Sequence, residues 1–396
     1  MISMIQSQSL KGFERFSVIL RPDRSLRREH SISREDELGA RWRKPTVRHT
    51  GKCWAEGLLQ QGIPRVNLAH FRALNDGIGI IQHAPYSKPD LTWGYTTDDV
   101  ARALVFVCRA GDIMEEPEQR TLVRKYVAFL DKMRTSDGRW SNEMRRDGSV
   151  ADAPSGRDHP GRAAWAAGCY ANSQLWGERA WGRRILDAGL QWALDTSSPR
   201  AKAYFLLGAC EFLKVERNAK LLEGATNLAK QLLGWYQAVS RLDWRWFEDI
   251  LAYDNARLPE SLAAWYETTK DTASLEVASE SLEFLVKVQT VQDVFAPIGN
   301  KGWYRVGEYR ALYDQQPDDA GATVEACNRL HRITGQKHYL DWSSFAFSWY
   351  SGFNLKRLAV YDSATGGCYD GLTKDGLNLN QGAESVLSYL LAVTSF

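Results

Sequence analysis

The sequence predicts an all-α protein in which two concentric layers of six helices form a closed ring. From about residue 66 to the C-terminus, apolar residues recur at three- and four-residue spacing in twelve segments. Segments with a charged face alternate along the chain with segments rich in Ala, Gly, Cys and Leu. Because small residues allow close packing on all sides, the second kind is expected to form the inner layer. The first charged segment should pair with the last apolar one and close the ring.

The twelve expected helices alternate between the two layers in chain order. The outer helices are expected at residues 71–82, 118–133, 177–194, 217–236, 272–289 and 337–352. The inner helices are expected at residues 98–110, 161–175, 198–214, 257–269, 318–334 and 380–393. Four inner segments carry a cysteine at a similar depth, namely Cys108, Cys169, Cys210 and Cys327. This regularity indicates an internal repeat of helix pairs.

Two regions of the chain differ in composition. Residues 1–60 are basic, polar and without clear periodicity, and are predicted to be a poorly ordered tail or a surface strap, whereas residues 61–396 form the helical domain. The formal net charge of +2 gives no indication of nucleic-acid binding. No apolar run approaches the roughly 20 residues of a membrane span, and no signal peptide is evident, so a cytoplasmic location is expected. The six cysteines lack metal-ligand spacing, and no cofactor motif is present.

The starts of the inner segments are rich in functional groups. If the inner helices run parallel, all six starts lie at one mouth of the ring. Helix capping accounts for one Asp, Ser or Thr at each start. It does not account for an arginine just inside four of the starts, at Arg102, Arg162, Arg200 and Arg257. Four long loops with Trp and Tyr lead into these starts, and such loops suit the apolar faces and hydroxyl rims of sugars. A sugar site at this mouth is therefore predicted.

Five stretches resemble a known group of proteins. They are HAPYSKPDLTWGYTTDDVARAL, YDNARLPESL, PIGNKGWY, DQQPDDAGATVEAC and TGGCYDGLTKDGLNLNQGAESVLSYLLA. The pattern over residues 66–396 resembles the six-hairpin, or (α/α)6-barrel, glycosidase-like superfamily. More narrowly, it resembles a bacterial domain found alone or fused to glycosyltransferases in polysaccharide gene sets. The resemblance implies the barrel and a glycan substrate, with carboxylates at the inner-helix starts acting as acid and base.

Glycoside hydrolysis requires two carboxyl groups with different roles. The catalytic candidates are Asp99, Asp158, Asp254, Glu260, Asp319 and Glu384. The candidates for substrate binding are His83, Trp93, Asp98, Arg102, His159, Asn255, Trp303, Gln315 and Gln381. Arg102 lies three residues after Asp99 on one helical face and is expected to hold that carboxylate ionised, as the helix N-terminus also does. The partner carboxylate is expected from across or around the ring, and the reaction is expected to invert the anomeric configuration, because opposed helices leave space for a water.

Two alternatives remain open at this point. A sugar epimerase or polysaccharide lyase on the same barrel would use His or Tyr for proton transfer, and His83 and His159 are placed near the mouth for this role. A non-catalytic glycan-binding module could instead partner a glycosyltransferase. The number of carboxylates favours a glycoside hydrolase acting on a bacterial oligo- or polysaccharide, without a metal or other cofactor.

Overall fold

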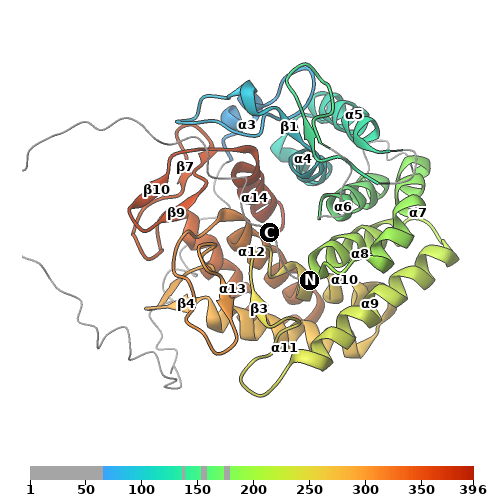
Figure 1. Ribbon diagram of the computed structural model, residues 1–396, viewed down its shortest axis with the longest axis vertical. Helices are drawn as coiled ribbons and strands as arrows, with labels where there is room; N and C mark the ends of the chain where they lie inside the picture. Colours follow the sequence, from blue (N-terminus) through green and yellow to red (C-terminus); the bar gives the residue numbers. More distant parts are fainter. Residues whose placement is uncertain (1–65, 136–138, 153–157, 174–178) are drawn as a thin grey trace, which may run out of the picture. The chain divides into compact units, whose positions relative to one another are not determined.

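The computed structural model describes residues 66–396 except 136–138, 153–157 and 174–178. The predicted tail, residues 1–60, lies outside the described residues, so it stays a prediction. Six inner helices surround the axis of the ring (Figure 1). They are α4 (Thr97–Arg109), α6 (His159–Asn172), α8 (Pro199–Leu213), α10 (Arg257–Thr269), α12 (Pro317–Thr334) and α14 (Ala383–Val393).

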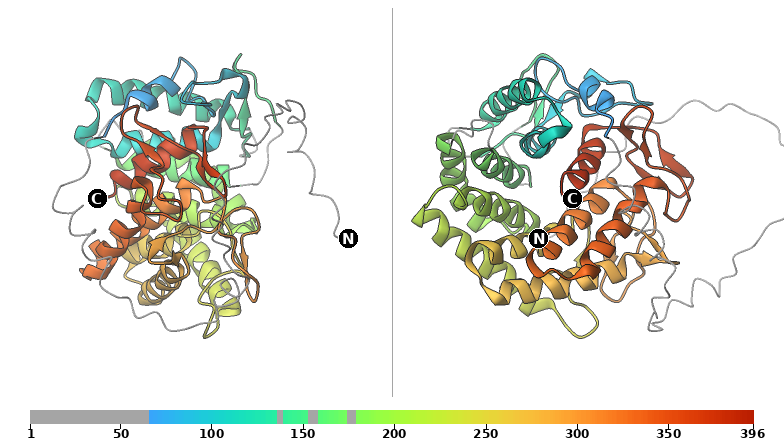
Figure 2. Two further views of the ribbon diagram at one scale, coloured as in Figure 1. Left: turned by 90° about the vertical axis from the view of Figure 1, so that its left-hand side faces the viewer. Right: turned by 180° about the vertical axis from the view of Figure 1, so that it is seen from behind.

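An outer layer of helices covers the inner layer (Figure 2). It consists of α3 (Ala69–Leu74), α5 (Glu116–Met133), α7 (Arg179–Asp195), α9 (Ala219–Val239), α11 (Thr272–Val288) and α13 (Lys337–Ser348). Each inner helix contacts the next one, from α4 through α14, and α14 contacts α4 again. The first outer helix, α3, also packs against α14, as the sequence predicts for ring closure. The described residues therefore form an (α/α)6 barrel.

The first outer helix is shorter than the prediction of residues 71–82. It ends at Leu74, and Asn75 pairs with Ile80 in a single β-bridge. The Asp76 carboxylate accepts hydrogen bonds from the backbone N–H groups of Ile78 and Gly79, which forms a turn. Such a side-chain turn competes with helix propagation, so it ends the helix despite the continuing apolar pattern.

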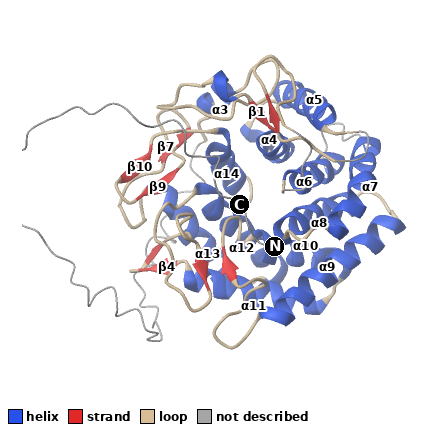
Figure 3. Ribbon diagram, viewed as in Figure 1, coloured by secondary structure: helices blue, strands red, loops and turns tan. Residues whose placement is uncertain are grey.

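Short strands occur only in the connections between the described helices (Figure 3). They form five antiparallel pairs, and three short 3-10 helices lie between other elements. The pairs are β1 (Tyr95–Thr96) with β2 (Glu143–Met144), β3 (Ile250–Leu251) with β6 (Tyr304–Arg305), β4 (Thr290–Val291) with β5 (Val294–Phe295), β7 (Tyr361–Asp362) with β8 (Gly367–Cys368), and β9 (Gly371–Thr373) with β10 (Gly376–Asn378). The 3-10 helices are η1 (Leu91–Trp93), η2 (Gly111–Ile113) and η3 (Trp349–Ser351).

Small residues decide how closely the inner helices approach. A Cβ atom on Gly208 of α8 would lie 2.2 Å from the carbonyl oxygen of Ala164, and one on Gly168 of α6 would lie 2.0 Å from the carbonyl oxygen of Gly208. The backbones of α6 and α8 are thus in direct contact, which only glycine permits at these positions. This close packing narrows the barrel and brings polar side chains of different inner helices within reach of one another. Among the described residues, no helix is long and apolar enough to cross a membrane.

Candidate active site

The starts of the inner helices converge at one mouth, because their side chains form ion pairs with one another. Arg162, in the first turn of α6, donates from Nη1 to Asp98 of α4 at 2.7 Å and from Nη2 to Asp254, just before α10, at 2.6 Å. Tyr204 of α8 donates to the same oxygen of Asp254 at 2.7 Å. The Arg162 guanidinium thereby joins the starts of α4 and α6 to the residue that leads into α10, and Tyr204 of α8 joins this group through Asp254. The Arg162 side chain is 6% exposed, and its Nε–H donates to no partner among the described residues.

The two carboxylates held by Arg162 are kept ionised. Burial by itself raises the pKa of a carboxyl group, but Arg162 and Arg102 outweigh it and lower the pKa of Asp98. The same two arginines, with Arg257 and the Tyr204 hydrogen bond, hold the pKa of Asp254 far below its ordinary value. Asp254 also adopts a left-handed backbone conformation, with φ of 48°, which is unusual for a residue other than glycine. Its position is therefore fixed by the contacts around it.

A second ion-paired group forms on the other side of α4. Nη1 of Arg102 lies 3.3 Å from Oδ1 of Asp99 and 3.3 Å from Oε2 of Glu384, in the first turn of α14. Thr96 caps α4 by accepting from the Asp99 backbone N–H, and its hydroxyl donates to the Asp99 carboxylate at 2.7 Å. The Glu384 side chain is 45% exposed, whereas that of Asp99 is 5% exposed. One arginine thus joins a buried and a solvated carboxyl group.

Burial, and not Arg102, decides the protonation of Asp99. Burial raises the pKa of Asp99 to about 7, with smaller contributions from Glu384 and Asp98, and the favourable charge of Arg102 does not cancel this effect. The expectation that Arg102 and the helix N-terminus keep Asp99 ionised is therefore wrong at neutral pH, although the contact between Asp99 and Arg102 forms. Near pH 7 the protonated and ionised forms of Asp99 are therefore both populated.

Two further carboxyl groups, at the start of α12, have raised pKa values. Burial, followed by the charge of Asp254, raises the pKa of Asp319 to about 8, and burial with Asp319 as a neighbour raises the pKa of Asp318 well above its ordinary value. Asp319 accepts from the backbone N–H and the side-chain amide of Asn255, each at 3.3 Å. Its other oxygen, like Oδ1 of Asp318, is buried without a partner among the described residues. The mouth therefore contains both protonated and ionised carboxyl groups.

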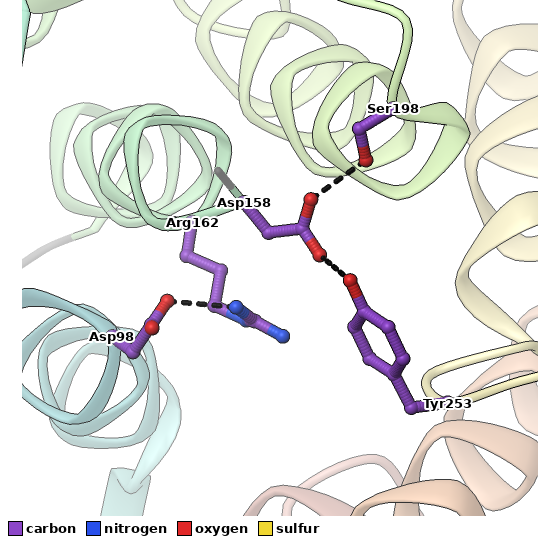
Figure 4. A pocket seen from close by; sticks show the side chains of 5 residues that line it. All are labelled: Asp98, Asp158, Arg162, Ser198 and Tyr253. Atoms are coloured by element: carbon purple, nitrogen blue, oxygen red, sulfur yellow. Dashed lines mark hydrogen bonds and ion pairs between the residues drawn. The ribbon is translucent and has the colours of Figure 1, made fainter. Parts of the chain in front are cut away.

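Two cavities open at the mouth. The first, here the Tyr253 cavity, has a volume of about 390 Å³ and is lined by Asp98, Asp158, Arg162, Ser198 and Tyr253 (Figure 4). Asp158 accepts hydrogen bonds there from the hydroxyls of Ser198 at 2.7 Å and Tyr253 at 2.5 Å. The second, here the Glu384 cavity, has a volume of about 200 Å³. Its lining residues are Gln82, His83, Asp99, Gln316, Pro317, Asp370, Asn378, Gly382, Glu384 and Ser385.

Some residues predicted for the site do not line either cavity. Glu260 is buried in the barrel interior, where it pairs with Arg257 at 2.6 Å and with Arg329. His159 is 1% exposed, and its Nε2 lies 3.1 Å from the carbonyl oxygen of Trp140. Gln315 is fully buried and accepts a hydrogen bond from Trp349. These three side chains are placed to support the barrel and not to touch a ligand in these cavities.

The remaining predicted residues lie around the cavities. Asn255 and Gln381 are buried, and Asn255 connects Asp319 with Arg200. Trp303 is half-buried and packs against Tyr253, with ring centroids 6.1 Å apart. Trp93 is 61% exposed and packs edge-to-face against His83 at 4.9 Å. Both tryptophans thus contact a residue that lines a cavity.

Several cavity residues were missed by sequence reasoning, above all Asp370. Asp370 accepts from the Gly382 backbone N–H at 2.9 Å and from the Ser385 hydroxyl at 2.6 Å, and also from Asn380. It lies in one of the long loops whose composition indicated a site, but it does not start a helix, so the rule that selected the catalytic carboxylates passed over it. Tyr253 was missed because it lies in the loop just before the candidate Asp254, and Ser198 because a serine at the start of the segment 198–214 is accounted for by helix capping.

Comparisons with known proteins agree on the fold. No model of a known protein family and no curated protein matches the chain. Solved structures match most of its length. A sugar epimerase from a ruminal bacterium is 13% identical, with 85% of this chain and 97% of that chain covered and a TM-score of 0.67. Cellobiose 2-epimerase from Bacillus thermoamylovorans is 10% identical, with 86% and 98% covered and a TM-score of 0.64.

A glycoside hydrolase shares the same architecture. A family 76 α-mannanase from Bacteroides thetaiotaomicron is 9% identical, with 87% of this chain and 94% of that chain covered and a TM-score of 0.59. The chain has the six-hairpin glycosidase fold. Proteins of this fold in the comparison act on sugars by epimerisation, isomerisation or hydrolysis, so the six-hairpin fold alone does not choose the reaction.

Within the described ranges, no group of three or more His, Cys, Asp or Glu side chains is arranged to hold a metal ion. The acid groups at the mouth are held by arginines and by hydroxyl and amide donors. The chemistry that they offer is proton transfer and nucleophilic attack by carboxyl groups.

Proposed function

We propose that the protein is a glycoside hydrolase that cleaves a neutral oligo- or polysaccharide in the Glu384 cavity. The observation that carries this proposal is the pair of carboxyl groups on Arg102. Asp99 is buried with a pKa of about 7, and Glu384 is solvated and ion-paired. Glycoside hydrolysis requires one carboxyl group that donates a proton and a second that acts as a carboxylate, and differing environments are what separate the two roles.

The roles follow from these environments. Asp99 donates its proton to the glycosidic oxygen as the bond to the anomeric carbon breaks. Glu384 is the carboxylate that faces the anomeric carbon, and Arg102 fixes both groups relative to each other. A general acid works best when its pKa is near the working pH, which suits Asp99 at neutral pH. Asp370 and Ser385 are placed in the same cavity to bind hydroxyl groups of the sugar.

The separation of this pair favours retention of configuration. Oδ1 of Asp99 and Oε2 of Glu384 each lie 3.3 Å from the same nitrogen, so these oxygens are at most twice that distance apart. Retaining enzymes place the two carboxyl groups about 5–5.5 Å apart, and inverting enzymes about 6.5–9.5 Å. The expectation of inversion assumed helices on opposite sides of the ring, but α4 and α14 are neighbours. In the retaining reaction Glu384 forms a glycosyl ester, and Asp99 then takes a proton from the water that hydrolyses it.

Epimerisation is the second candidate, because solved sugar epimerases share the fold. It needs two proton-transfer groups, one on each face of the sugar. Among the described histidines only His83 lines either cavity, and it lies 2.8 Å from the side-chain nitrogen of Asn380. Elimination is less favoured, because lyases act on uronic acids whose carboxylate must be neutralised. Among the described residues no Arg or Lys lines the Glu384 cavity, and Arg162 in the other cavity is already paired.

A panel of oligosaccharides with defined linkages tests these reactions together. Purified protein is incubated with each sugar, and products are separated by chromatography, while proton NMR follows the anomeric signals. Hydrolysis with retention is expected, and Asp99→Asn and Glu384→Gln should each lose activity by roughly 10²–10⁴-fold. Asp375→Asn and Glu308→Gln are matched controls, because both side chains are exposed and line neither cavity. Exchange of a sugar proton with solvent without cleavage would identify an epimerase instead.

A further inference from the structure

A group of exposed apolar side chains lies beside the Glu384 cavity. Tyr86 is 70% exposed, Trp93 61%, Leu379 43% and Leu91 38%. They come from two segments that are far apart in the chain but joined by their backbones, since the Tyr86 N–H donates to the Leu379 carbonyl at 3.0 Å and Pro85 pairs with Asn380. We call these four residues the rim patch.

The rim patch is continuous with the wall of the cavity. His83 and Asn378 line the Glu384 cavity, and each lies on one of the two segments that carry the patch. The Trp93 ring packs edge-to-face on the His83 ring, with centroids 4.9 Å apart. A ligand that fills the cavity and extends along this wall therefore meets Trp93 next.

Packing within the barrel does not account for the exposed aromatic rings. Isolated exposed apolar residues are common, but neighbouring large ones beside a polar cavity mark an interaction site. Tyr86 and Ser87 also have left-handed backbone conformations, with φ of 52° and 66°, which carry a cost for residues other than glycine. The turn that exposes Tyr86 to solvent therefore has a backbone conformation that these two residues do not favour by themselves.

The chemistry of the neighbouring cavity indicates what the patch binds. The Glu384 cavity has three carboxyl groups, those of Asp99, Asp370 and Glu384, and no Arg or Lys among its described lining residues. Such a cavity disfavours uronic, sulfated or phosphorylated sugars. Neutral pyranose rings have apolar faces of C–H groups that stack on exposed aromatic rings.

We infer that Trp93 and Tyr86 form a stacking platform for a further sugar of a neutral glycan chain, beyond the two sugars that flank the bond cleaved in the Glu384 cavity. The inference rests on one part of the proposed function, namely that a glycan binds in the Glu384 cavity. It does not depend on whether that glycan is hydrolysed. It defines the substrate class as a chain of neutral sugars longer than a disaccharide.

Binding is measured by calorimetry with cellohexaose, mannohexaose, xylohexaose and maltohexaose, with their disaccharides, and with hexagalacturonate as an acidic chain. The protein carries Asp99→Asn to prevent turnover. At least one neutral hexasaccharide should bind about tenfold more tightly than its disaccharide, and Trp93→Ala should remove this advantage without weakening the disaccharide. Trp93→Phe, which keeps a ring, should restore most of it. Leu242→Ala is the control, because Leu242 is 91% exposed away from the rim patch.

The outcomes separate the platform from the proposed function. If Trp93→Ala weakens disaccharide and hexasaccharide equally, Trp93 only supports His83 and the platform is wrong. If no neutral hexasaccharide binds, or if hexagalacturonate binds best, the inference is overturned as well. If a hexasaccharide binds as expected but the wild-type protein hydrolyses nothing, hydrolysis fails and the platform stands. If the protein hydrolyses long chains and neither Trp93→Ala nor Tyr86→Ala changes the rate, hydrolysis stands and the platform is wrong. A protein partner would then be the remaining occupant of the rim patch.

Discussion

Asp98 and Asp99 are neighbours in the chain, yet their carboxylates line different cavities and contact different arginines. Asp98 pairs with Arg162 in the Tyr253 cavity, whereas Asp99 pairs with Arg102 in the Glu384 cavity. Their pKa values also move in opposite directions, because Arg162 and Arg102 lower that of Asp98 while burial raises that of Asp99. Two adjacent residues in the first turn of α4 therefore have different roles: Asp98 is an ionised carboxylate, and Asp99 is a proton donor.

The pH dependence of catalysis should report the Asp99 proton. With an unactivated oligosaccharide, kcat/KM is expected to fall above pH about 7, by about tenfold for each further pH unit, because the general acid is lost. With a dinitrophenyl glycoside of the same sugar, whose leaving group needs no proton, this decline should disappear. A decline that is equal for both substrates would assign the proton to another group.

Stability should depend on pH through the same group. The pKa of Asp99 is about 7 in the folded state and about 3.9 in an unfolded chain, so the folded state binds the proton more tightly. Its stabilising contribution is complete below pH about 4 and is lost as the pH rises to about 7. The free energy of unfolding of the wild type, relative to Asp99→Asn, should therefore decrease across this range. Urea denaturation at a series of pH values measures it, and a difference that does not vary with pH would contradict the assignment.

Loss of the Arg162 guanidinium should destabilise the barrel strongly. Arg162→Met leaves the buried Asp254 and the half-buried Asp98 without this partner, and loss of a partner from a buried ion pair typically costs about 3–5 kcal/mol. Because Arg162 lowers both pKa values below the unfolded value of about 3.9, its contribution to stability should be complete above pH about 4, and the difference from wild type should shrink as the pH falls below that value. Arg184→Met removes an exposed pair with Asp131 and should cost less than about 1 kcal/mol. Equal losses for the two variants would contradict a buried bridge.

The approach of α6 and α8 should not tolerate a methyl group. Gly208→Ala places a Cβ 2.2 Å from the Ala164 carbonyl oxygen, so the helices must separate, and the thermal midpoint should fall by many degrees. Gly234→Ala, in α9, meets nothing within 4 Å and should raise stability by about 0.5–1 kcal/mol through helix propensity. Differential scanning calorimetry of both variants tests this, and a tolerated Gly208→Ala would show that the inner layer is looser than described.

The sequence by itself determined the helical layers and the polar mouth. Period and composition separate the inner segments, such as residues 98–110, from the outer ones, because burial on all sides requires small apolar residues. Arginines such as Arg102 and Arg162, repeated inside the helix starts, likewise indicated a site, since capping does not need them. These features are local in sequence, so a single chain displays them without its fold.

Only the tertiary structure decided which polar residues line the cavities and which of the carboxyl groups are protonated. Glu260 and His159 resemble the other candidates in sequence, but packing buries them away from the cavities, whereas Asp370 enters the Glu384 cavity from a loop. The raised pKa of Asp99 is also a tertiary property, because it depends on how completely residues from α14 and the surrounding loops exclude water. Pair contacts such as Arg102 with Glu384 join residues nearly three hundred positions apart. Local pattern carries no information about such distances, and both burial and charge proximity arise only when the ring closes.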